Sequence, residues 1–391
     1  MSEKVKRILL LSTAYLPAIG GSELALKNIT ERLDEYEFDI ITGHTMPGTP
    51  EKEQQGNVTI YRVGGPLAMS QFLVPKIFLP FAIAFKASQL LKKNEYALMH
   101  AYQASQAAGA GWIIKHVYPS LKFLLTVQEG KNLGAQPWII RYLRSTILKS
   151  IDRATVISTY LQKYVQSIRE DIVVDLIPNG VDTNLFSRRD ASFLRGQLNI
   201  PDQHAIIVSI SRLVEKNGIE YLISAFKEVS IKHLSSLVIV GDGPLKKSLQ
   251  TLTKELDIGH LVHFISACPP AEVVLYLSLA DVFIRPSLSE GFGTAFIEAM
   301  SVGVPVIGPA VGGITDFLIN EKTGLVCISH DPHDIARQIL RLLNDKTLQN
   351  ELVQNAKTMV NERYTWDYIA EQMRSVYDQI INNKHQISNK F

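Results

Sequence analysis

The sequence has few cysteines, little net charge and no long uninterrupted apolar run, and each scarcity narrows the class of protein. Only Cys268 and Cys327 occur among the 391 residues, and their spacing matches neither a zinc site nor a disulfide framework. The 40 Lys and Arg residues nearly balance the 38 Asp and Glu residues, so no strong positive field indicates a nucleic-acid partner. We therefore expect no bound metal, no nucleic acid and a reducing, cytoplasmic location.

No targeting or membrane-spanning segment is predicted. The amino-terminal apolar run covers only residues 8–11, which is too short for the core of a signal peptide and is typical of a buried strand. The most apolar region, residues 67–94, is interrupted by Pro75, Pro80 and Lys86. That composition favours a buried or interfacial helix over a spanning one. A helix packed on the core and a helix on a membrane surface both stay open.

Length and composition indicate a globular chain of two domains. With 391 residues, of which 46% are hydrophobic and 20% charged, the chain exceeds what one core usually holds. Short apolar runs alternate with amphipathic stretches, as buried parallel strands and their crossover helices require. The predicted strands are residues 7–12, 38–42, 57–63, 96–101, 122–127, 154–158, 173–178, 205–211, 236–241, 261–266, 281–285 and 304–308.

These patterns predict two doubly wound α/β domains, residues 1–180 and 181–363. The turn residues of IPNGVD (177–182) mark the junction. A final amphipathic helix is predicted over 364–382.

The stretch SEGFGTAFIEAM (289–300) sets Glu290 and Glu298 on either side of a Gly-Phe-Gly turn. It follows a predicted strand, where open parallel sheets bind their ligands. The backbone N–H groups of Gly293 and Thr294, at the start of a helix, suit a phosphate. A carboxylate accepts two hydrogen bonds, so Glu298 suits a vicinal diol such as a ribose, and Glu290 suits sugar hydroxyls.

Two further loops of the second half have the same character. After the strand in IVSISRLVEKNG (207–218) come Arg212 and Lys216, and an arginine there can grip a diphosphate with two hydrogen bonds. The next loop contains Gly241 and Gly243, which let a base or ribose approach the backbone. The three loops together indicate a nucleoside diphosphate ligand.

The first half has one comparable loop. Gly20 and Gly21 follow the first strand and precede a helix, which suits a phosphate or a sugar. No G-x-G-x-x-G dinucleotide fingerprint and no G-x-x-x-x-G-K-[ST] motif occurs. Hydride transfer and P-loop hydrolysis therefore lose their usual support.

Taken in order, the motifs resemble glycosyltransferase family 4. They are GGSE (20–23), PNGVD (178–182), SRLVEKNG (211–218), VGDGPL (240–245) and ADVFIRPSLSEGFGTAFIEAMSVGVPVI (280–307). The resemblance implies the GT-B fold, in which two Rossmann-like domains face a cleft and the C-terminal helix crosses back to the first. It also implies metal-independent, retaining transfer of a sugar from a nucleoside diphosphate sugar. The second domain would bind the donor and the first would receive the acceptor.

The resemblance further implies roles for single residues. Glu298 would hold the ribose, Glu290 would contact the donor sugar, and Arg212 with Lys216 would neutralise the diphosphate. Glu290, Arg212 and Lys216 are accordingly the expected catalytic residues. The family usually has its lysine one position after Lys216, where this chain has Asn217.

The expected contacts of the first domain are less specific. The resemblance places Gly20 and Gly21 on the diphosphate. His100, Gln128 and Glu129 follow or end strands and are candidates for the acceptor or sugar side. The family commonly has His where this chain has Gln128, and glutamine cannot act as a base, although it can hydrogen-bond sugar hydroxyls.

Three functions stay open at this point. The leading hypothesis is a retaining hexosyltransferase with a lipid-linked or membrane-surface acceptor, in peripheral contact with the inner face of the membrane through 67–94. A nucleotide-sugar epimerase of the same architecture is the second. A catalytically silent subunit that binds sugar nucleotides is the third.

Overall fold

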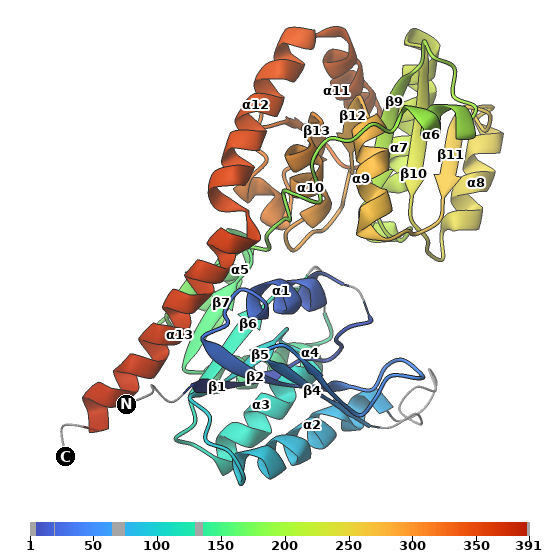
Figure 1. Cartoon of the computed structure of the whole chain (residues 1–391). Helices are drawn as coiled ribbons and strands as arrows, with labels where there is room; N and C mark the ends of the chain where they lie inside the picture. The colour runs from blue at the N-terminus through green and yellow to red at the C-terminus, as the bar shows by residue number, and fades with distance from the viewer. Residues whose placement is uncertain (1–4, 19, 65–74, 130–135, 389–391) are drawn as a thin grey trace. The chain divides into compact units, whose positions relative to one another are not determined.

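The computed structural model describes residues 5–18, 20–64, 75–129 and 136–388, and the chain divides into two compact units. Unit 1 comprises Met1–Asn179 and Trp366–Phe391, and unit 2 comprises Gly180–Thr365. Each unit is built around its own sheet (Figure 1).

The sheet of unit 1 has eight strands in the order β3-β4-β2-β1-β5-β6-β7-β8. All neighbours are parallel except β3, which pairs antiparallel with β4 at the edge. The strands are β1 (Lys6–Leu11), β2 (Tyr36–Gly43), β3 (Lys52–Gln55), β4 (Val58–Val63), β5 (Leu98–Tyr102), β6 (Phe123–Val127), β7 (Arg153–Val156) and β8 (Val174–Leu176).

The helices of unit 1, apart from the C-terminal one, connect strands that follow one another in the chain, as parallel pairing requires. They are α1 (Gly21–Thr30), α2 (Pro75–Leu91), α3 (Gln106–Val117), α4 (Trp138–Ser150), α5 (Thr159–Ile168) and the C-terminal α13 (Trp366–Ser388). The core on one side of the sheet combines residues of β1, β2, α1 and α13.

The sheet of unit 2 has six parallel strands in the order β11-β10-β9-β12-β13-β14. They are β9 (Ala205–Ile210), β10 (Ser235–Val240), β11 (Val262–Ile265), β12 (Val282–Ile284), β13 (Val306–Pro309) and β14 (Leu325–Cys327). The helical segments are α6 (Ser192–Gln197), η2 (Glu215–Asn217), α7 (Ile219–Lys232), α8 (Lys246–Glu255), α9 (Pro270–Leu279), α10 (Thr294–Val302), η3 (Gly312–Asp316), α11 (Pro332–Asn344) and α12 (Lys346–Arg363).

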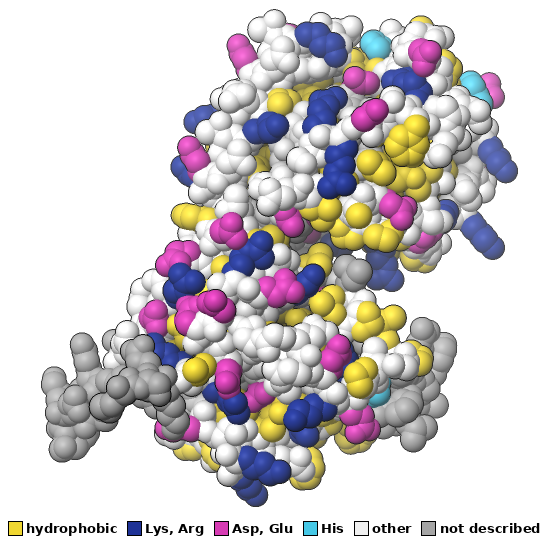
Figure 2. All heavy atoms as spheres, viewed as in Figure 1, with side chains coloured by type: hydrophobic (Ala, Val, Ile, Leu, Met, Phe, Trp, Pro, Cys, Tyr) yellow, Lys and Arg dark blue, Asp and Glu magenta, His cyan; other side chains and the backbone are white. Residues whose placement is uncertain are grey.

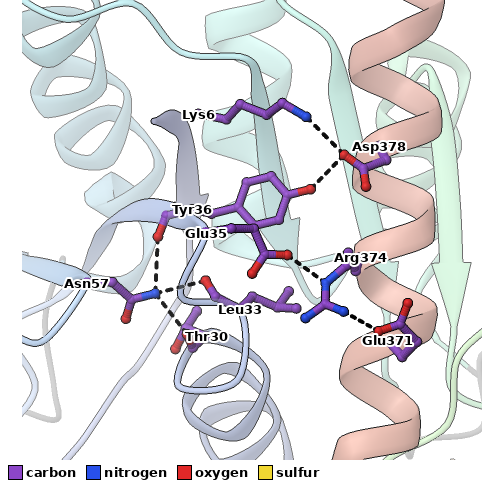
Figure 3. A network of polar contacts seen from close by, with 9 residues as sticks. All are labelled: Lys6, Thr30, Leu33, Glu35, Tyr36, Asn57, Glu371, Arg374 and Asp378. Atoms are coloured by element: carbon purple, nitrogen blue, oxygen red, sulfur yellow. Dashed lines mark hydrogen bonds and ion pairs between the residues drawn. The ribbon is translucent and has the colours of Figure 1, made fainter. Parts of the chain in front are cut away.

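The last helix, α13, belongs to unit 1 because its apolar face packs into the core of that unit. Trp366, Ile369, Met373 and Tyr377 are buried there. Polar contacts at the rim fix its register (Figure 3). Lys6 and Tyr36 donate to Asp378, and Arg374 donates to Glu35. Arg374 also donates to Glu371 within α13 itself.

The predicted fold class, two doubly wound units with a returning C-terminal helix, is confirmed. All twelve predicted strands overlap observed ones. The prediction missed β3 and β14. β3 has the polar sequence KEQQ and an exposed edge position, so it carries no apolar signal, and β14 is only three residues long.

The apolar segment 67–94 contains α2, while its first eight residues, 67–74, lie outside the described part of the chain. Leu79, Ile83 and Ala87 are buried in unit 1, whereas Phe81 and Phe85 are 61% and 69% exposed. The helix is therefore both a core helix and an apolar surface. In the part of the chain that the structure describes, no helix has the length and hydropathy to cross a membrane.

Candidate functional site

The predicted donor residues of unit 2 lie at the point where the chain changes direction in the sheet. From β9 the chain proceeds to β10 on one side, and β12 lies on the other side of β9. At such a switch point the loops that leave the two strands diverge and open a ligand-binding crevice. Arg212 and Lys216 are on the loop after β9, and Glu290 is on the loop after β12. The Leu288 N–H donates to the Lys216 carbonyl at 2.7 Å and joins the two loops.

The loop after β12 leads into α10 without a capping side chain. Gly293 is the N-cap residue, with a φ of 100°, and Thr294 begins the helix. The helix N-terminus therefore presents backbone N–H groups and the positive end of its dipole. Glu298 lies in the second turn of this helix. Burial raises the pKa of the Glu298 carboxyl to about 7, against an opposing effect of the Arg285 charge.

The carboxylate of Glu290 is held by protein groups. Its Oε2 accepts a hydrogen bond from Arg285, which is only 8% exposed, and its Oε1 accepts from the Gly291 N–H at 3.2 Å. Arg285 also donates to the Ser287 hydroxyl at 3.1 Å and lies over the Phe296 ring at 5.3 Å. Sequence reasoning missed Arg285, although a charged residue that ends the apolar run DVFIR was a usable signal.

Arg212 and Asn217 differ sharply in environment. The Arg212 side chain is exposed at the end of β9, so it is available to an anion. Asn217 is 4% exposed, and its amide donates to the Arg212 carbonyl at 2.6 Å. The residue at the family's lysine position therefore shapes the backbone that carries Arg212. Lys216, one position earlier, is half-buried.

The two glycines of the loop after β10 lie against the backbone of the loop after β9. A Cβ atom on Gly241, whose φ is 143°, would lie 1.9 Å from the Ser211 carbonyl oxygen. One on Gly243 would lie 2.2 Å from the Leu213 carbonyl oxygen. These contacts require glycine whether or not a ligand binds, because the loops after β9 and β10 pack backbone against backbone.

The loop edge of unit 1 has its own switch point, between β1 and β5. Gly20 is the N-cap residue of α1, and no side chain caps the helix. The Thr13 and Ser105 hydroxyls lie 3.1 Å apart, and the Gln103 amide donates to the Ser22 hydroxyl at 2.9 Å. Gly21, which begins α1, is exposed at this edge.

His100 is not at this edge, and its expected acceptor role is wrong. Its ring is fully buried, with Nδ1 2.9 Å from the Tyr377 hydroxyl and Nε2 2.6 Å from the Thr126 hydroxyl. Burial lowers the pKa of the imidazole to about 3. Because both ring nitrogens are occupied inside the core, His100 joins α13 to the sheet and cannot reach a ligand.

Gln128 and Glu129 follow β6, and both are half-buried. Glu129 Oε1 accepts from the Ala104 N–H at 2.7 Å, while its Oε2 is buried with no hydrogen-bond partner among the described residues. Burial raises the pKa of this carboxyl, and the Arg144 charge opposes that rise. Arg144 is a buried residue of α4, and nothing in its amphipathic context singled it out.

Within the described ranges, no group of three His, Cys, Asp or Glu residues is arranged to hold a metal ion. The positive groups near the β9–β12 switch point are side chains and backbone amides.

Comparisons with known proteins assign the chain to a family. Residues 19–185 match the family described as Glycosyltransferase Family 4, and residues 190–359 match Glycosyl transferases group 1. An uncharacterised glycosyltransferase of Methanocaldococcus jannaschii is 29% identical, with 95% of this chain and 97% of that protein aligned. N-acetyl-alpha-D-glucosaminyl L-malate synthase of Bacillus anthracis is 24% identical, with 95% and 97% aligned.

Among solved structures, sucrose-phosphate synthase from Thermosynechococcus elongatus is similar over 97% of this chain and all of that chain, with a TM-score of 0.84 and 25% identity. The fold is therefore GT-B, as predicted. The chain belongs to the family 4 glycosyltransferases and is a glycosyltransferase.

Proposed function

We propose that this glycosyltransferase moves a sugar from a nucleoside diphosphate sugar to an acceptor with retention of the anomeric configuration. The observation that carries the proposal is the set of groups at the β9–β12 switch point. Arg212 is exposed there, the start of α10 has no capping side chain, and the Glu290 and Glu298 carboxyls are on the same loop and helix. Cations and amides suit a diphosphate, and carboxylates suit the hydroxyls of ribose and sugar.

In this proposal the enzyme contributes chiefly by stabilising the negative charge of the leaving diphosphate. The bond between the anomeric carbon and the diphosphate oxygen breaks, and a bond to the acceptor oxygen forms on the same face. The acceptor proton passes to the leaving phosphate, so no enzymic base is needed. Arg212, Lys216 and the first N–H groups of α10 stabilise the charge that develops on the leaving diphosphate. Because these groups supply the positive charge, the proposed reaction uses no metal.

The remaining donor residues serve the nucleotide. Glu298 would accept from the ribose hydroxyls, and Glu290 from the donor sugar. Gly241 and Gly243 would line the approach to the nucleotide, and Gly20 and Gly21 would offer backbone groups at the start of α1. Gln128 and Glu129 would contact the acceptor, and Glu129 Oε2 has no hydrogen-bond partner among the described residues.

The proposed acceptor is lipid-linked or lies at a membrane surface. The observation behind this is a continuous helical layer of unit 1, in which α2 packs on α3 and α3 contacts α4. These three helices contain no Asp or Glu, while Lys86, Arg141 and Lys149 supply positive charge. Lys115 of α3 is paired with Asp152 at 2.7 Å. Along the lower edge of unit 1, where α2 lies in Figure 1, basic and apolar side chains lie beside each other (Figure 2).

Large apolar side chains of this layer are exposed to solvent. On α2 they are 55% to 75% exposed, and on α4 they are 43% to 76% exposed. The residues are Ile77, Phe78, Phe81 and Phe85 of α2, and Trp138, Ile139, Ile140, Tyr142 and Leu143 of α4. Exposed apolar side chains with basic side chains on the same helices suit an anionic lipid surface.

The donor is tested by thermal unfolding with UDP-, GDP- and ADP-sugars. A donor at 100 times its dissociation constant raises the free energy of unfolding by about 2.7 kcal/mol. We expect one nucleotide series to stabilise the protein, followed by transfer to an acceptor with retained configuration. Epimerisation of the donor without acceptor would instead favour the epimerase. Binding without turnover across lipid and soluble acceptors would favour the silent subunit.

The membrane surface is tested by flotation with vesicles of anionic lipid at low salt. We expect the wild type to co-float, and the Phe81→Glu/Phe85→Glu and Trp138→Glu variants to remain in solution. Phe193→Glu, at a 52% exposed position of α6 in unit 2, is the matched control and should float like the wild type. A wild type that does not co-float would point to a soluble acceptor.

A further inference from the structure

Arg285 is a buried arginine whose charge is held by neighbouring side chains. It follows β12 directly and is 8% exposed. Its Nε donates to the Ser287 hydroxyl at 3.1 Å, its Nη2 donates to Glu290, and its guanidinium lies 5.3 Å from the centre of the Phe296 ring. A buried charge is stable only when it is paired and hydrogen-bonded, so these contacts define one side-chain position.

Glu290 is fixed at its backbone as well as at its carboxylate. Its carbonyl accepts from the Gly313 N–H at 3.2 Å. The neighbouring Gly312 has a φ of 52°, and a Cβ atom there would lie 1.8 Å from the Glu290 carbonyl oxygen. The segment after β13 thus holds the Glu290 backbone while Arg285 holds its side chain. The carboxylate is set in place before any ligand arrives.

The charge of Arg285 also acts on the second carboxyl. Burial raises the pKa of Glu298, and Arg285 is the charged group that lowers it. Glu290 shares the loop but is already paired with Arg285.

We propose that Arg285 is a positioning residue for the donor sugar, which fixes the Glu290 carboxylate for the sugar hydroxyls. The inference rests on the proposed function, because it needs a nucleotide sugar at the β9–β12 switch point. It differs from the role of Arg212, whose exposed side chain would meet the diphosphate itself. Arg285 acts through the Glu290 carboxylate and need not touch the donor.

A structural ion pair is the competing explanation, and a double-mutant cycle separates the two. The variants are Arg285→Met, Arg285→Lys, Glu290→Gln and the Arg285→Met/Glu290→Gln double variant. The probe is whichever of UDP-, GDP- or ADP-glucose stabilises the wild type, with the matching nucleoside diphosphate as a sugar-free control. Calorimetry gives affinity from about pH 6 to pH 8.5, and transfer assays give kcat and KM.

We expect Arg285→Met to lower kcat/KM by roughly 10- to 100-fold in the wild type, as the loss of a charged hydrogen bond would. In the Glu290→Gln background, Arg285→Met should lower kcat/KM only a few-fold further, because the carboxylate that Arg285 holds is already absent. Affinity for the sugar-free diphosphate should change little at pH 8.5. The pH midpoint of donor affinity should move upward in Arg285→Met and stay in place in Arg285→Lys, which keeps the charge.

Equal losses in both backgrounds with an unmoved midpoint would overturn the inference and leave Arg285 a structural residue. If Arg285→Met does not fold, Arg285→Lys decides. It should lose kcat/KM because one ammonium group cannot replace the fork that bonds Ser287 and Glu290, and wild-type kinetics would overturn the inference. If no nucleotide sugar stabilises the wild type, the proposed function fails first and takes this inference with it.

Discussion

The two units share the strand order around their switch points but use the loop edge of the sheet differently. In unit 2 the loops after β9, β10, β12 and β13 are joined by backbone contacts, and a buried Arg285–Glu290 pair lies among them. In unit 1 the equivalent edge has neutral pairs, Thr13 with Ser105 and Gln103 with Ser22, and the carboxylate of Glu129, which accepts from the Ala104 N–H. A switch point opens a crevice at the loop edge, and the side chains on its loops determine which chemistry that crevice can accept.

The cores of the units differ as well. Unit 2 has an apolar core of residues from α7, α11 and the strands. Unit 1 encloses a polar chain in which Tyr377, His100, Thr126 and Thr155 are linked in order by hydrogen-bond contacts. This chain joins the C-terminal helix to the sheet. The stability of unit 1 should therefore depend on acid through the imidazole of His100, which contacts Tyr377 of α13.

The largest expected effect tests the charged edge of unit 2. Arg212→Ala should lower kcat by roughly 100- to 1,000-fold, because the diphosphate loses a group that stabilises its charge as it leaves. Donor affinity should fall less than kcat does. Lys232→Ala, at the exposed end of α7 in the same unit, is the control. Steady-state kinetics with equal losses in kcat and affinity, or none, would make Arg212 an ordinary surface residue.

A second test concerns Glu298 of unit 2 and the charge state of its carboxyl. Glu298→Ala should weaken nucleotide-sugar binding by about 1.5–3 kcal/mol at pH 8, where the carboxylate is ionised and accepts from a diol. Since the pKa of Glu298 is about 7, wild-type affinity should fall as the pH is lowered through 7, when the carboxyl gains a proton. Calorimetry of the variant should show a flat profile over the same range. A wild type with the same flat profile would remove Glu298 from the donor site.

A third test uses the polar core of unit 1. The folded imidazole of His100 has a pKa of about 3, against an ordinary value of 6.5. Between these values the unfolded chain binds a proton that the folded chain does not, so stability falls as the pH is lowered below 6.5. Lowering the pH from about 6.5 to 5 should therefore lower the free energy of unfolding by about 2 kcal/mol. Urea unfolding of His100→Asn at several pH values should show a smaller loss of stability with acid than the wild type shows. The same pH dependence in both proteins would contradict a buried, neutral His100.

The smallest expected effect concerns Asn217. Asn217→Ala removes the hydrogen bond to the Arg212 carbonyl and should lower the free energy of unfolding by about 1 kcal/mol. Turnover should fall modestly, because the Arg212 backbone loses a support while the side chain remains. Thermal unfolding and kinetics on the same preparation check both. A turnover loss as large as that of Arg212→Ala would mean that Asn217 itself contacts the donor.

The fold was predictable because buried parallel strands need apolar residues on both faces, and that requirement is visible in runs such as AIIVSI at β9. β3 escaped because an exposed edge strand has no such requirement. The position of the candidate site was predictable for a related reason. Charged and glycine residues directly after apolar runs must lie at one edge of a parallel sheet, so Arg212, Glu290 and Gly293 could be grouped without coordinates.

The environment of single side chains was not predictable, since it depends on segments far apart in the chain. His100 ends an apparent strand and looked available, but Tyr377 of α13 closes over it. Gly241 looked like a ligand-facing glycine, but the Ser211 carbonyl already requires it. The apolar segment 67–94 left a core helix and a surface helix open, and α2 is both.

By itself the sequence determined the two doubly wound units, the C-terminal helix and the order of the ligand-type loops, because these follow from local periodicity and turn residues. The tertiary structure alone decided that Arg285 holds Glu290, that Asn217 supports the Arg212 backbone and that His100 lies in the core. Periodicity places a residue on a strand, a helix or a loop. Its charge state and its partners depend on which other segments exclude water from it.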